Sequence, residues 1–75
     1  MDGAMIIKLI SALGEIRMHN KVSGIEFPRR NELQIAFKDT FADLIIPISP
    51  DMDNNLLVGI FYNYLETPES RMAIA

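Results

Sequence analysis

Residues 33–46 read LQIAFKDTFADLII, two short apolar runs joined by the polar residues Lys38, Asp39 and Thr40. A turn at residues 39–40 places three apolar pairs on one side of the resulting hairpin: Leu33 with Ile46, Ile35 with Leu44, and Phe37 with Ala42. A shift of one residue would move this set to the other face, because side chains alternate along a strand. The sequence therefore predicts an antiparallel β-hairpin with one apolar face.

The ten residues after the next polar loop, LLVGIFYNYL at 56–65, fit either a strand or a helix. Apolar residues occur there at helical spacing, and Ser49 followed by Pro50 is a favourable helix start. Valine, isoleucine and the aromatic residues nevertheless favour strands. A strand whose loop is centred on Met52 would also extend the apolar pairs of the hairpin into three layers. We therefore predict a third strand over 56–65, with a helix as the alternative.

The N-terminal residues 5–18 carry apolar side chains at three- and four-residue spacings, which is the pattern of an amphipathic helix. The apolar stripe consists of Ile6, Leu9, Ile10, Leu13 and Ile16. Gly14 weakens the helix by about 1 kcal/mol relative to alanine. His19, Asn20 and Lys21 then suit a helix end, where positive charge meets the negative end of the dipole.

Together these segments predict a single small α+β domain over residues 1–75. The N-terminal amphipathic helix packs on a three-stranded antiparallel β-meander, and a short helical turn or tail follows from Thr67. Residues 25–27 can add a short strand that ends at Pro28. If residues 56–65 are helical, the architecture becomes helix–hairpin–helix.

The composition excludes several classes of site and partner. The 75 residues contain no cysteine, so disulfides and cysteine-ligated zinc are excluded. Ten acidic against seven basic residues, a net charge of −3, argue against a domain that binds nucleic acid mainly through its phosphates. No apolar run approaches the length of a membrane span, and Asp2 before Lys8 is unlike a secretory signal. We expect a cytoplasmic protein without membrane contact.

The acidic stretch DMDNN at 51–55 opens like a calcium-binding loop but does not continue like one. An EF-hand needs glycine at the sixth position and glutamate at the twelfth. This chain has Leu56 and Tyr62 there. We therefore expect a turn-rich loop, no metal and no cofactor.

Catalytic groups are sparse in this chain. His19 is the single histidine, and no serine forms a recognisable nucleophile–histidine motif with it. Asp51 and Asp53 are the closest pair of carboxylates on one segment, and an exposed loop does not supply the buried setting that acid–base catalysis needs. We predict that the protein is not an enzyme, and that His19 serves a helix end.

The predicted strand over 56–65 would leave a partly apolar face and an edge that contains neither lysine nor proline. The residues expected on that face are Phe41, Ile45, Leu57, Phe61 and Leu65. They predict a protein–protein interaction module, a homodimer or a subunit of an assembly, that acts by occluding or bridging surfaces. The alternative is that the segment from Thr67 onward, with Met72 and Ile74, covers this face.

A second functional hypothesis rests on Lys21, Arg29 and Arg30, the candidate anion- or nucleic-acid-binding residues of a small regulator. Two neighbouring arginines without an aromatic stacking surface are also typical of a solvated loop. The small acidic composition further suggests an inhibitor or adaptor of the kind encoded by phages and plasmids, an interpretation that rests on composition alone.

Overall fold

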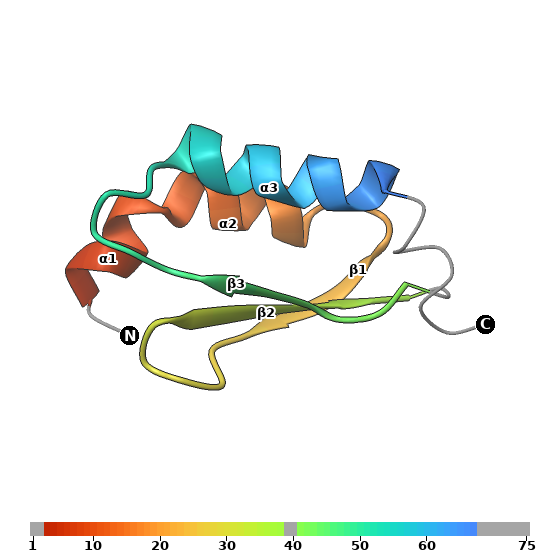
Figure 1. Ribbon diagram of the computed structural model, residues 1–75, viewed down its shortest axis with the longest axis horizontal. Coiled ribbons are helices and arrows are strands. Elements are labelled where there is room, and N and C mark those ends of the chain that lie inside the picture. Colours follow the sequence, from red (N-terminus) through yellow and green to blue (C-terminus); the bar gives the residue numbers. More distant parts are fainter. Residues whose placement is uncertain (1–2, 39–40, 68–75) are drawn as a thin grey trace.

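The computed structural model describes residues 3–38 and 41–67, which form two layers, with the helices on one face of a sheet (Figure 1). The elements in chain order are α1 (Gly3–Lys8), α2 (Ile10–Arg17), β1 (Val22–Glu26), β2 (Glu32–Phe37), β3 (Leu44–Pro47) and α3 (Asn54–Glu66). The strands form one antiparallel sheet in the order β1-β2-β3. The predicted α+β fold, with an N-terminal helix on a three-stranded antiparallel meander, is confirmed.

The hairpin of β2 and β3 has the predicted register. Leu33 pairs with Ile46, and Ile35 pairs with Leu44. Phe37 and Ala42 do not continue this ladder, because β3 begins only at Leu44. The turn residues 39–40 lie outside the described part of the chain.

The predicted strand over 56–65 is wrong, because these residues form most of α3. Asp53 caps the helix, and its Oδ1 accepts a hydrogen bond from the Leu56 N–H at 2.9 Å. Leu57 and Phe61, four residues apart, are both fully buried against the sheet side. The four-residue spacing and the cap therefore outweigh the strand preference of the individual residues.

The third strand of the sheet is β1, Val22–Glu26, which includes part of the short strand expected at 25–27 and lies beside β2, on the opposite side of the hairpin from the strand predicted at 56–65. It pairs with β2 through Ile25 and Ile35, and a bulge lies between Val22 and Gly24. The helix start also differs from the expected one, since Ser49 and Pro50 lie in the preceding loop.

The helix predicted over 5–18 is present as α1 and α2, with Leu9 at the turn between them. Three residues of this region, Leu9, Ala12 and Ile16, are buried, and they lie three and four positions apart. Gly14 lies within α2 at an exposed position, outside the buried stripe. The C-terminal turn or tail predicted from Thr67 is described only at Thr67, which ends α3; residues 68–75 lie outside the described part.

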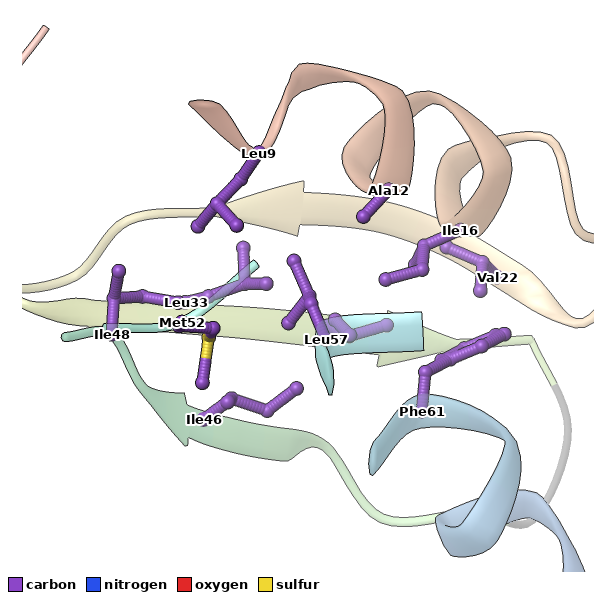
Figure 2. Packing of buried hydrophobic residues seen from close by; sticks show 11 residues of the cluster. Leu9, Ala12, Ile16, Val22, Leu33, Ile46, Ile48, Met52, Leu57 and Phe61 are labelled. Atoms are coloured by element: carbon purple, nitrogen blue, oxygen red, sulfur yellow. The ribbon is translucent and has the colours of Figure 1, made fainter. Parts of the chain in front are cut away.

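The core lies between the helical layer and the sheet (Figure 2). Its buried residues are Leu9, Ala12, Ile16, Val22, Leu33, Ile35, Ile46, Ile48, Met52, Leu57 and Phe61. Phe61 stacks on Phe37, with ring centroids 6.2 Å apart and planes 7° from parallel. The Ala12 N–H donates to Asn54 Oδ1 at 3.0 Å, which ties α2 to the start of α3. The sheet is thus covered on one face, and its other face carries no helix among the described residues.

The cap of α3 gives a testable stability effect. We expect Asp53→Ala to lower the free energy of unfolding by about 1 kcal/mol, because the Leu56 N–H loses its acceptor. Urea unfolding followed by circular dichroism measures this. Asp51→Ala, which removes an equal charge from the same loop, is the control and should change stability by less than about 0.5 kcal/mol. Equal effects of the two substitutions would contradict the cap.

Tyr64 gives a pH-dependent effect. Its hydroxyl donates to the Ala42 carbonyl oxygen, 2.5 Å away. Burial and, second, the nearby charge of Asp43 raise the pKa of the Tyr64 phenol above its usual 10.0. The stabilising contribution of this phenol is therefore fully present below the unfolded pKa, and it is lost as the pH rises through the folded pKa.

We accordingly expect Tyr64→Phe to destabilise the protein by about 1 kcal/mol at neutral pH, because the hydrogen bond is lost. The difference from wild type should shrink above about pH 10, where the wild-type phenol ionises. Urea unfolding at pH 8 and pH 11 measures both values. Tyr62→Phe is the control, since the Tyr62 hydroxyl makes no hydrogen bond within the described residues. A Tyr64→Phe effect that is the same at both pH values would contradict the assignment.

Candidate binding surface

The free edge of β1 exposes backbone groups that are able to pair with another strand. The Ile48 N–H donates to the Asn31 carbonyl oxygen at 2.7 Å. Because hydrogen-bonded pairs alternate along an antiparallel ladder, the backbone groups of the odd-numbered β2 residues point to β3, and those of the even-numbered residues point to β1. Ile25 lies opposite one of the odd-numbered positions, Ile35. Its N–H and C=O therefore point away from β2, toward an edge that no described strand occupies.

The other edge of the sheet is protected. On β3 the edge-facing positions are Ile45 and Pro47, by the same alternation. Pro47 has no N–H, and proline on an edge strand opposes pairing with a further strand. On β1 the bulge is confined to residues 22–24, and the ladder is regular from Gly24 to Glu26. The two edges thus differ, and β1 is the one open to strand pairing.

An open groove of about 540 Å³ runs beside this edge, between α2 and β1. On α2 it is lined by Ile10, Leu13, Gly14 and Arg17, and on the strand side by Ser23, Gly24, Ile25 and Phe27. The four helix residues lie at positions i, i+3, i+4 and i+7, which share one helix face. This face adjoins the one that carries the buried residues of α2, and Leu13, which also packs against the core, lies where the two meet.

The absence of a side chain at Gly14 leaves space on the helix side of the groove. A Cβ added at Gly14 or Gly24 would meet no atom within 4 Å. Ile10 is 61% exposed and Phe27 is 39% exposed, so apolar surface remains in contact with solvent at one end. Burial of such surface by a partner is favourable.

The charges on the two sides of the β1 edge are opposite. Arg17 is the one charged side chain among the described residues that line the groove, and no described carboxylate lies within ion-pair distance of it. On the sheet face without helices, a second hollow of about 340 Å³ is lined partly by Glu26, Gln34 and Asp43. The Gln34 Nε2 donates to Asp43 Oδ2 at 2.8 Å. The groove is therefore lined by one positive side chain, and the hollow on the open side by two acidic ones.

The five residues predicted as an interface do not form a common exposed surface. Leu57 and Phe61 are 0% exposed and belong to the core, because their segment is a helix and not a strand. Phe41 is also buried, and Leu65 is half-buried against the core. Ile45 is exposed, on the sheet face without helices. The alternative cover from Met72 and Ile74 falls on residues outside the described part.

The basic residues of the second hypothesis are not brought together. Arg29 and Arg30 lie in the loop after β1, where Arg29 Nε is 3.8 Å from Glu32 Oε1. Lys21 precedes β1, at its other end, and its Nζ lies 5.2 Å from the Phe41 ring centroid. The three residues therefore do not define one anion-binding surface.

The acidic loop and His19 have structural roles. Asp53 caps α3, and Met52 between the two aspartates is buried. His19 accepts a hydrogen bond from the Lys21 N–H at its Nδ1, 3.2 Å away, and contacts the Phe61 ring edge-on. Within residues 3–38 and 41–67, no group of three or more histidine, aspartate or glutamate side chains is placed to hold a metal ion.

Comparison with known proteins gives no indication of function, so the surface around the β1 edge is interpreted from its geometry alone. No protein-family model, curated protein or solved structure matches this chain. In the described part, no helix is long and apolar enough to cross a membrane. The open edge of β1 and the groove beside it are the features that remain for functional interpretation.

Proposed function

We propose that this chain is a non-enzymatic protein–protein interaction module that takes up an extended segment of a partner as an additional strand on β1. In this mode of recognition, backbone hydrogen bonds supply affinity and pockets for alternate side chains supply specificity. The observation that carries the proposal is the pair of outward-facing backbone groups of Ile25 beside an open groove that is lined by both apolar and polar residues.

Two further observations support the choice of this edge. The β3 edge carries Pro47 at an outward-facing position, so β1 is the better template for pairing. The groove also lies on the side of β1 toward which the Ile25 side chain points, with space above Gly14 for an incoming side chain. A bound segment would then cover Ile10 and Phe27, which are exposed without a partner.

A selection from a random library of 12-residue peptides, displayed on phage and panned on the immobilised wild-type protein, tests the proposal. The selected peptides are then measured against Gly14→Leu, which fills the groove. We expect this variant to weaken binding at least tenfold while the protein stays folded, because an exposed helical glycine is replaced by a better helix former.

Gly59→Leu is the matched control. Gly59 is an exposed helical glycine on α3, a Cβ there also meets no atom within 4 Å, and it does not line the groove. We expect it to bind the selected peptides like wild type. If no peptide is enriched on the wild-type protein, or if the enriched peptides bind both leucine variants equally well, this binding site is wrong.

A further inference from the structure

We infer that the segment bound at β1 belongs to a different protein and has alternating chemistry: apolar residues and an acid on its groove side, and basic residues on its other side. This inference rests on the proposed function and adds the charge pattern of the partner. It follows from the opposite charges of the two hollows that flank the β1 edge.

On the groove side, the order of the lining residues sets the order of the partner residues. An antiparallel partner strand, the more common arrangement, places one residue opposite Ile25 and places the residues two before and two after it on the same face. The earlier of these lies toward Phe27 and Ile10, which favour an apolar residue. The later one lies toward Ser23 and Arg17, where a carboxylate would pair with the guanidinium.

On the open side, the residues between these positions face acidic groups. The partner residue opposite Glu26 lies next to that carboxylate. The partner residue opposite Gly24 meets no side chain there, so a long side chain at this position can extend toward Asp43. Among the described residues that line this hollow there is no basic side chain. Arginine or lysine at both partner positions would therefore complement the acidic face.

A second copy of this chain fits less well. If two β1 strands paired antiparallel about Ile25, Glu26 of one copy would lie opposite Gly24 of the other, on the face that already carries Glu26 and Asp43. Phe27 of one copy would lie opposite Ser23 of the other, so Arg17 would face an aromatic ring and no carboxylate. The charges thus favour a foreign segment over self-pairing.

A pair of synthetic peptides tests the charge pattern. The first has the core Val-Arg-Val-Arg-Asp between serines, with acetylated and amidated ends, and the second exchanges the charges to give Val-Asp-Val-Asp-Arg. Each is titrated into the ¹⁵N-labelled full chain and followed by amide chemical shifts. We expect the first peptide to bind at least tenfold more tightly at low salt, and the ratio to fall as salt is added.

A charge swap tests whether the aspartate of the first peptide pairs with Arg17. We expect Arg17→Glu to weaken the first peptide about fivefold, and a peptide ending in Val-Arg-Val-Arg-Arg to recover that loss on the same variant. Arg30→Glu, an equal charge change at an exposed residue that does not line the groove, is the control and should leave both affinities unchanged.

Several results would overturn the inferred charge pattern without contradicting the proposed function, which the library selection tests separately. These are equal or reversed affinities of the two peptides, no recovery in the charge swap, or groove-binding library peptides that lack the pattern. Light scattering gives one more: a dimeric wild type whose Gly14→Leu variant is monomeric would make a second copy the occupant.

Discussion

Replacing Phe61 by alanine is expected to lower the free energy of unfolding by about 3–5 kcal/mol, the largest effect of any single substitution considered for this chain. The Phe61 side chain is 0% exposed and is packed between the two layers (Figure 2). Its ring contacts those of Phe37 and His19, so truncation leaves a cavity and also removes aromatic contacts. A chain of this length has a total stability of roughly 4–11 kcal/mol, so the variant will be close to unfolding.

Urea unfolding monitored by circular dichroism measures this effect. The neighbouring Tyr62 is the control, because its ring is 39% exposed and also contacts Phe61 from the side. We expect Tyr62→Ala to cost less than half as much as Phe61→Ala. A Phe61→Ala variant as stable as wild type would place this ring outside the core and contradict the packing of α3.

The second large effect separates two adjacent leucines. We expect Leu57→Ala to lower the free energy of unfolding by about 2–5 kcal/mol, because the side chain is fully buried in the core. Leu56 is 49% exposed on the same helix, and Leu56→Ala should cost less than about 1 kcal/mol. Both changes replace leucine by alanine in one helix, so helix propensity contributes almost equally to each.

The pair therefore measures burial alone. Guanidinium unfolding at a fixed pH gives both values from the shift in midpoint. Similar losses for the two variants, or a larger loss for Leu56→Ala, would mean that a different face of residues 56–65 points to the sheet.

The hairpin and the N-terminal helix could be predicted because their signals come from many residues at once. The register of Leu33 with Ile46 and of Ile35 with Leu44 is the one that keeps these paired apolar side chains on one face. The strand predicted over 56–65 is wrong because the strand preference of single residues and an apparent register with the hairpin are weaker signals than the Asp53 cap and the helical spacing of Leu57 and Phe61. Local propensity is a weak predictor when tertiary packing favours the other structure.

The proposed binding surface could not be predicted, because it depends on which strand lies at the edge of the sheet. A strand at 56–65 would leave β1 only a minor place in the sheet and would expose Leu57 and Phe61, which are in fact buried. The sequence also places Leu9 and Ile10 in one apolar stripe, whereas the structure buries Leu9 and turns Ile10 to the groove. An exposed glycine between Leu13 and Arg17 was the available signal for this second face.

Hydrogen exchange at two backbone amides tests most directly whether β1 is the docking edge. Ile25 and Ile45 both direct their N–H groups to a free edge of the sheet, on β1 and β3 respectively. With a library-selected peptide at saturating concentration, we predict that exchange of the Ile25 amide slows at least tenfold, while the Ile45 amide exchanges as it does without peptide. Unchanged exchange at Ile25 under saturation, or protection at Ile45 in its place, would contradict the account.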